Sequence, residues 1–326
     1  MKKVKFAFSV LILLLIFAFT LNSVKYIEVS LQGILLWGTL VLPALLPFMF
    51  FSKLLISTGF ADSTSKIFKK FTTKLFKCPP ISAFVYVISI ISGYPVGAKL
   101  VSELYKQGEI SKEEAYKITT FTSTSGPSFI IGTVAGGMLK SFKAGIIIFV
   151  SHLIGAIING ILFRNFKLNK NSKNYQVYIK DKKIESLQDI AYNCVSSILV
   201  VGVYICIFFL VTEILTDLNI MYILTKPLEM LLGVFNIDTN VSYSIINGLF
   251  EITKGCKLIS TSFLNNQILI TTLITGIITF GGLAIYCQAI TFLKEFDMTT
   301  SFYFKQKITH TVFSMVICLI LCLIFM

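Results

Sequence analysis

Two short segments of the chain share a pattern of glycine, a small residue, lysine and leucine. They are Gly97–Leu100 and Gly255–Leu258, and a further glycine follows the first residue of each, Gly126 after 29 residues and Gly281 after 26. Both segments interrupt apolar stretches, and a broken helix exposes N–H groups at one end and carbonyls at the other. Such ends bind ions or anionic groups, and glycine lets a ligand approach the backbone. The pattern predicts two related units that share one binding site.

The candidate binding residues flank these interruptions and combine hydroxyls, glycines and a few charges. In the first unit they are Ser92, Gly93, Pro95, Gly97, Lys99, Ser123, Thr124, Ser125, Gly126, Pro127 and Ser128; in the second they are Asn247, Glu251, Thr253, Lys254, Gly255, Gly281 and Gly282. An ionisable side chain at membrane depth is costly unless paired or hydrated, so Lys99 and Glu251 are functional candidates. Alternatively, the glycines only allow close helix packing while Lys99 and Lys257 extend to the surface. The two interrupted units together favour a binding site.

Enzyme chemistry has no positive support in the sequence. His152 and His310 lie within or beside apolar spans, too far apart in sequence to suggest a metal pair, so we interpret them as packing residues. We find no nucleotide-binding loop, metal-ligand motif, nucleophile elbow or paired acids. We therefore expect neither an enzyme nor a bound cofactor or metal.

The composition places these motifs in a membrane. The chain has 326 residues, 55% of them hydrophobic, and a mean hydropathy of +0.81. Apolar stretches of roughly 20 residues, long enough to cross a bilayer as a helix, recur along it. The net charge of +13 comes from lysines clustered in loops, so we expect no nucleic-acid partner. The scattered cysteines predict free thiols. The predicted class is an all-α polytopic integral membrane protein.

The predicted organisation has five regions. Residues 1–60 form N-terminal membrane helices, 61–79 an interfacial amphipathic helix, 80–164 the first repeat, 165–186 a basic cytoplasmic loop, and 187–326 the second repeat with a C-terminal membrane helix. The first span is interpreted as a retained anchor, although its basic start also fits a cleaved signal peptide. Lysines opposite Ile67, Phe71 and Leu75 indicate an interfacial helix, with a solvated basic loop as the alternative.

Each repeat is predicted to combine a re-entrant hairpin with an interrupted helix. Neither half of Ile81–Gln107 spans a bilayer alone, which indicates a hairpin. Ser111 and Glu114 predict a capping box that opens the next helix, which breaks near Gly126. The segments predicted after the basic loop are a helix at 187–215, a re-entrant unit at 222–263 and spans at 267–293 and 307–326. The distribution of Lys and Arg predicts a cytoplasmic N-terminus and units that enter from opposite faces, hence two inverted repeats.

Four motifs resemble those of a known family. They are Trp37–Phe48, Ser92–Lys99, Thr124–Gly132 and Ser151–Gly155. They resemble the YlbJ (SpoVV) family of sporulation integral membrane proteins, in the group with nucleoside-recognition, or Gate, domains. Tyr94 departs from this resemblance, because a smaller or polar residue is expected there.

The resemblance implies a multi-pass protein of endospore formers that lies in the outer forespore membrane and helps to pass dipicolinic acid toward the spore. Dipicolinate is a planar dianion that suits helix N-termini and Lys99 or Lys254. The wider family is similar in design to concentrative nucleoside transporters, so a nucleoside is the rival substrate. We expect a transporter of a small organic anion, in contact with membrane lipids and with a homo-oligomer as one option. The alternative from another class is a non-transporting membrane subunit or assembly factor.

Overall fold

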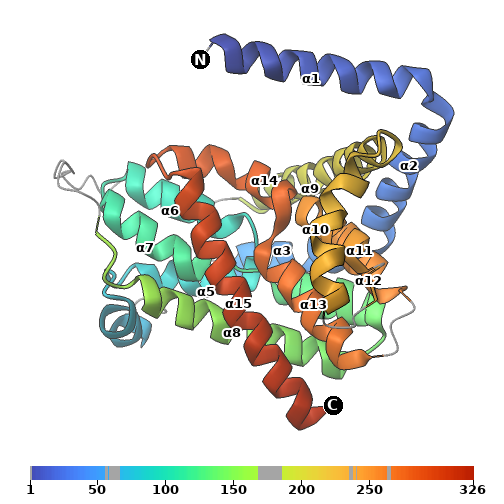
Figure 1. Cartoon of the computed structure of the whole chain (residues 1–326). Helices are drawn as coiled ribbons and strands as arrows, with labels where there is room; N and C mark the ends of the chain where they lie inside the picture. Colours follow the sequence, from blue (N-terminus) through green and yellow to red (C-terminus); the bar gives the residue numbers. More distant parts are fainter. Residues whose placement is uncertain are drawn as a thin grey trace.

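The computed structural model describes residues 2–55, 58, 67–167, 186–234, 238, 239, 241–262 and 266–326, and these form helices without a strand (Figure 1). In chain order the helices are α1 (Lys2–Leu21), α2 (Ser23–Leu36), η1 (Trp37–Val41), α3 (Leu42–Leu55), η3 (Thr72–Phe76), α5 (Ser82–Ser92), α6 (Val96–Lys106), α7 (Lys112–Thr122), η4 (Ser128–Leu139), α8 (Phe142–Phe163), α9 (Leu187–Asp217), α10 (Ile220–Val234), α11 (Val241–Phe250), α12 (Ile252–Ser260), α13 (Gln267–Phe280), α14 (Gly282–Lys294) and α15 (Thr300–Phe325). The segments η1, η3 and η4 are π-helical. Most of the predicted basic loop, 168–185, lies outside the described residues, as does Lys66.

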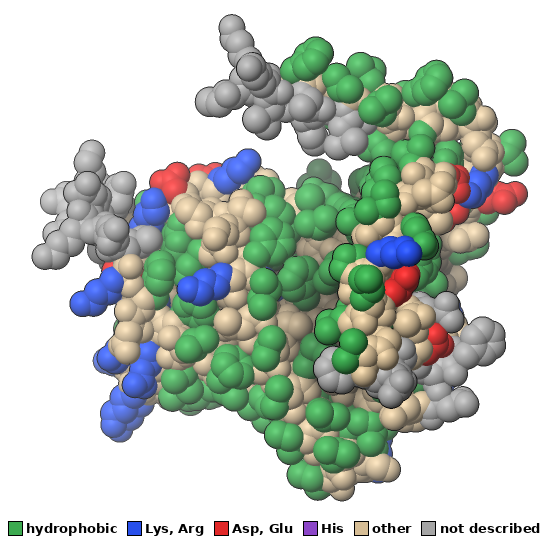
Figure 2. All heavy atoms as spheres, in the orientation of Figure 1, with side chains coloured by type: hydrophobic (Ala, Val, Ile, Leu, Met, Phe, Trp, Pro, Cys, Tyr) green, Lys and Arg blue, Asp and Glu red, His purple; other side chains and the backbone are tan. Residues whose placement is uncertain are grey.

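The described part of the chain contains five helical runs that are long and apolar enough to cross a membrane. They are Ser23–Leu55, Phe142–Phe163, Leu187–Asp217, Gln267–Lys294 and Thr300–Phe325. Apolar side chains cover most of the face shown in Figure 2, while Lys and Arg gather at one edge. On α15, for example, Ile308, Val312 and Val316 are each more than half exposed along one helical stripe. The predicted class, an all-α integral membrane protein, is confirmed.

Two units with the same order of elements follow one another. The first consists of the hairpin α5–α6, the interrupted helix α7–η4 and the long helix α8; the second consists of the hairpin α11–α12, the interrupted helix α13–α14 and α15. Their packing is reciprocal, since α6 packs on α14, α12 packs on η4, and α8 crosses α15 (Figure 1). The second unit is shorter than the predicted second repeat at 187–326, because α9 (Leu187–Asp217) and α10 (Ile220–Val234) precede it. That the repeats are inverted stays a prediction.

The helix breaks lie where the sequence interrupts the apolar stretches. In the first unit, Gly93 ends α5 with a positive φ of 71°, and a Cβ there would lie 2.5 Å from the backbone nitrogen of Gly126. The tip of the hairpin therefore lies directly against the unwound segment between α7 and η4. In the second unit, Gly281 and Gly282 have φ values of 87° and 67°, which favour glycine, and Gly282 lies against the last carbonyls of α11. Both interrupted helices thus break beside a hairpin tip.

Several predicted boundaries agree with the structure. The capping box of Ser111 and Glu114 is present at the start of α7, and the helices predicted at 143–163 and 187–215 correspond to α8 and α9. Residues 67–76 are helical, as predicted for the interfacial helix. Phe71 and Leu75 pack against the core, whereas Ile67 is 72% exposed.

Two predicted boundaries were wrong. The second hairpin occupies only Val241–Ser260, because the first part of the predicted re-entrant unit forms a separate helix, α10. The last helix begins at Thr300, not near Lys307, because Phe302 and Tyr303 are buried against the first unit. Lys307 is therefore more than one turn inside a helix, with its side chain fully buried.

Candidate functional site

A cavity of about 750 Å³ lies between the hairpin of the first unit and the elements that face it. Its walls come from η1, α3, α5, α6, η4, α9, α12 and α14, together with the tip of the first hairpin and the break between α7 and η4. Most of the wall is apolar, including Phe84, Phe129 and Phe292. Charged side chains come from both units and from α3, namely Lys53, Lys99, Glu103 and Glu251. The cavity is thus an apolar chamber with a few charges, as is typical of small-molecule sites.

Eight of the predicted site residues line this cavity. They are Ser92, Gly93, Pro95, Lys99, Ser125, Gly126, Glu251 and Thr253. They come from the tip of the first hairpin, the break of the first interrupted helix, and the start of α12. Residues of both units therefore line one cavity, although the two breaks do not contribute equally to its wall.

The other ten predicted residues lie outside the cavity wall. Gly97 packs against the Thr122 carbonyl, and Gly255 packs against the backbone of Gly248. The Lys254 ammonium donates a hydrogen bond to Thr212 Oγ1 at 2.7 Å and lies 5.1 Å from the centre of the Phe209 ring. The remaining seven are Ser123, Thr124, Pro127 and Ser128 at the first break, Asn247 within α11, and Gly281 and Gly282 at the second break.

Glu251 and Lys99 reach the cavity in different ways. Glu251 caps the N-terminus of α12, where its carboxylate accepts a hydrogen bond from the backbone N–H of Lys254 at 2.7 Å, and it is only 3% exposed. The cap explains locally why the hairpin turns there, because an N-cap carboxylate satisfies an N–H group that the helix leaves free. Lys99 is instead half exposed and lies 3.9 Å from Glu103 on the next turn. Lys99 is therefore a hydrated, paired lysine.

Lys307 lies behind the first hairpin tip and was not among the predicted site residues. Its ammonium donates to the Tyr94 hydroxyl at 3.0 Å and to the Ser123 carbonyl at 3.2 Å, and lies 4.5 Å from the centre of the Tyr94 ring. The Tyr94 hydroxyl in turn lies 3.2 Å from the carbonyl of Ile278, near the end of α13. Tyr94, the residue that departs from the family resemblance, therefore connects the first unit to the second.

A polar stripe in the sequence could have revealed Lys307. Tyr303, Lys307, His310 and Ser314 recur at the spacing of one helix face, and all four are buried in α15. The mixed composition before residue 307 hid this stripe, because it resembled a loop leading into an apolar span.

The two histidines, predicted to be packing residues, are both fully buried and stack with ring centres 4.9 Å apart. His152 Nε2 accepts a hydrogen bond from the Ser125 backbone N–H at 2.9 Å, so the ring proton is on Nδ1, which lies 2.9 Å from Thr279 Oγ1. His310 Nε2 lies 3.0 Å from the His152 carbonyl oxygen. The pair connects the first break to the end of α13. Among the described residues, no three His, Cys, Asp or Glu side chains group in a way that would hold a metal ion.

Residues 39–142 match the Gate family model, which is described as nucleoside recognition. The chain is also 27% identical, over 90% of its length and 77% of the relative's, to the sporulation integral membrane protein YlbJ of Bacillus subtilis. No solved structure matches the chain. The resemblance predicted from the four motifs is confirmed, and the chain is an integral membrane protein similar to a sporulation protein.

The Gate match covers only one side of the cavity. It runs from η1 to the start of α8, and so includes Tyr94 and the break at Ser123–Pro127. Glu251 and Lys307 lie outside it, in the second unit. The cavity therefore combines a segment of recognised type with a partner segment that the family model does not describe.

Proposed function

We propose that this protein is a transporter of a small organic anion, dipicolinic acid, across the outer forespore membrane during sporulation. The observation that carries the proposal is the 750 Å³ cavity, which lies between two interrupted helical units in a membrane protein. Transporters bind their solutes where discontinuous helices meet near the middle of the bilayer. The similarity to YlbJ, a sporulation protein, supports the spore as the setting.

The chemistry of the cavity suits a planar aromatic acid. Phe84, Phe129 and Phe292 offer apolar surface to a pyridine ring, and Lys53 and Lys99 offer positive charge to its carboxylates. The volume of about 750 Å³ leaves ample room for one such molecule and falls within the range of small-molecule pockets. Glu251 offers a carboxylate that is compatible with proton coupling. In this proposal the protein moves its solute unchanged, performs no reaction, and has membrane lipids as its other partners, with a cytoplasmic N-terminus.

The first experiment measures dipicolinic acid in spores of a strain that lacks the gene, together with total dipicolinic acid in the mother-cell fraction. We expect depleted spores while synthesis continues, because the solute then accumulates on the wrong side of the membrane. Normally loaded spores would overturn dipicolinic acid as the substrate. Purified protein in liposomes then tests transport directly, since only a transporter moves solute without other proteins.

The second candidate substrate is a nucleoside, and the description of the Gate family model favours it. A nucleoside also combines a flat ring with polar groups, and the neutral polar wall of Ser92, Ser125 and Gln288 would suit its hydroxyls. The same liposomes, supplied with uridine or adenosine in place of dipicolinate, separate the two substrates. Liposomes that move neither solute favour the non-transporting subunit or assembly factor.

A further inference from the structure

Lys307 is a buried cation whose partners are all neutral. Its side chain is 0% exposed, and its hydrogen bonds go to the Tyr94 hydroxyl and to Ser123. Among the described residues, no carboxylate forms an ion pair with it. Burying an ammonium without an anion costs free energy, so lysines at membrane depth normally have acidic partners or a functional role. A group with negative charge would therefore be a favourable further partner for Lys307.

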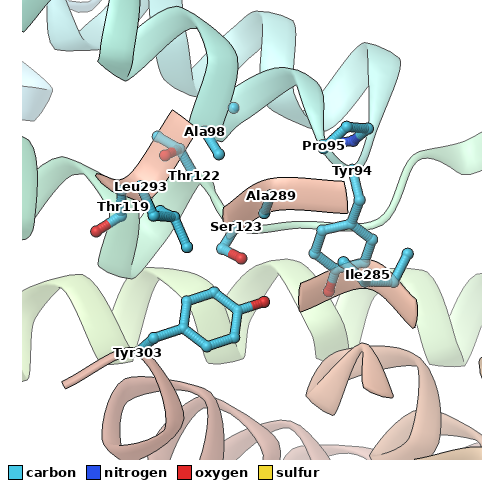
Figure 3. A pocket seen from close by; sticks show the side chains of 11 residues that line it. Tyr94, Pro95, Ala98, Thr119, Thr122, Ser123, Ile285, Ala289, Leu293 and Tyr303 are labelled. Carbon is cyan, nitrogen blue, oxygen red and sulfur yellow. The ribbon is translucent and has the colours of Figure 1, made fainter. Parts of the chain in front are cut away.

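Tyr94 is the barrier between Lys307 and the cavity. The Tyr94 side chain lines the large cavity on one side and, on the other, a gap of about 10 Å³ beside α15. This gap is large enough for about one water molecule, and the residues that line it include Thr119, Thr122, Ser123 and Tyr303. In Figure 3 the hydroxyl groups of Tyr94 and Tyr303 point into the space beside Ser123.

Rotation of one side chain would therefore join the two spaces. With Tyr94 turned aside, Lys307 would face the cavity with the hydroxyls of Ser123 and Tyr303 beside it. Together these groups supply a cation and two hydroxyl donors, the set that a carboxylate accepts from. Lys99, on α6, already lines the large cavity and is half exposed.

We propose that Lys307 is a carboxylate-binding subsite that opens when Tyr94 moves, and that it receives the second carboxylate of an aromatic dicarboxylate whose ring lies in the cavity. This inference rests on the proposed function, because it assumes that an organic anion enters the cavity. It adds the subsite that distinguishes a dicarboxylate from a monocarboxylate.

The test compares binding of dipicolinate with binding of picolinate, which has the same ring and one carboxylate, to the purified full-length protein by titration calorimetry. Lys307→Gln keeps a hydrogen-bond donor on a side chain one atom shorter but removes the charge. We expect it to weaken dipicolinate binding by about tenfold or more, as for a lost hydrogen bond to a charged group, and picolinate binding by much less. Lys305→Gln is the matched control, because Lys305 is exposed on the same helix.

The outcomes separate this subsite from the proposed function. If wild-type protein prefers dipicolinate and Lys307→Gln retains the full preference, the subsite is overturned while the function stands. If wild-type protein binds neither acid, both are overturned. Tyr94→Phe provides an independent check, since it removes the hydroxyl bound to Lys307 but leaves the charge. We expect Tyr94→Phe to keep the preference for dipicolinate over picolinate. If it loses this preference as fully as Lys307→Gln does, the charge of Lys307 is not what binds the second carboxylate.

Discussion

The two Gly-X-Lys segments lie at equivalent places in the two units but face different surroundings. In each, the glycine lies on the second arm of a hairpin and packs so closely against backbone that a side chain has no room: Gly97 against Thr122 and Gly255 against Gly248. The lysines differ. Lys99 lines the cavity, whereas Lys257 is exposed outside it. The shared motif therefore fixes how the hairpins pack, and only one copy also supplies charge to the cavity.

The hairpin tips differ in the same way. The first tip carries neutral groups, with Tyr94 reaching across to Lys307 and the end of α13. The second tip carries the buried carboxylate of Glu251. The two hairpin tips thus have similar backbones but present different side chains to one cavity, neutral groups from the first tip and a carboxylate from the second.

The largest effect is expected from alanine substitutions at Gly97 and Gly255, which should lower the stability of the protein. Gly97→Ala and Gly255→Ala each place a Cβ against backbone atoms that cannot move aside, so we expect each to lower the free energy of unfolding by about 1 to 3 kcal/mol. Thermal unfolding of the purified protein measures this. Gly38→Ala is the control, because a Cβ at that position would meet no neighbouring atom within 4 Å. Equal stability of Gly97→Ala and Gly38→Ala would show that the motif is not a packing motif.

Two variants of Glu251 separate the effect of its helix cap from the effect of its charge. Glu251→Gln keeps an oxygen that accepts from the Lys254 N–H, so the protein should fold. Dipicolinate uptake into liposomes should fall by about tenfold or more, because the carboxylate proposed to couple uptake to protons is lost. Glu251→Ala also removes the cap and should cost about 1 kcal/mol of stability. If the Glu251→Gln variant takes up dipicolinate at the wild-type rate, the carboxylate of Glu251 has no role in transport.

Lys99 and Lys257 form a matched pair. Lys99→Ala should reduce dipicolinate uptake about two- to fivefold, a modest effect because the lysine is half exposed and screened by water. Lys257→Ala should leave uptake unchanged. Equal losses in both variants would mean that general surface charge, and not the cavity, attracts the anion.

The smallest effect is expected where the units join at the surface. Lys106 on α6 lies 2.9 Å from Glu295 at the end of α14, and both side chains are more than a third exposed. Lys106→Ala should therefore reduce stability by less than about 1 kcal/mol. Thermal unfolding at low and high salt checks this. Salt should weaken the Lys106–Glu295 ion pair in the wild-type protein, whereas the Lys106→Ala variant has no such pair to lose. A larger, salt-independent loss would indicate that this contact holds the units together.

Much of the helical layout could be predicted from local patterns. The break at Ser123–Pro127 was visible because glycine, proline and hydroxyl residues interrupt an apolar run, and the cap at Ser111 was visible from its spacing to Glu114. The start of α15 was not, because Phe302 and Tyr303 are held in a helix by contacts with residues far away in the chain. Lys307 was missed for a different reason, because the mixed composition before it hid the polar stripe of α15.

The sequence by itself determined the membrane class, the apolar helices, the two interrupted units and the glycines at their turns, because hydropathy and helix breaking act over a few neighbouring residues. Only the tertiary structure decided which predicted residues share a cavity, that His152 meets His310, and that Tyr94 covers Lys307. Those juxtapositions depend on how α8 crosses α15 and how each hairpin packs on the opposite unit. Such long-range packing follows from the joint fit of many side chains, and no local pattern encodes it.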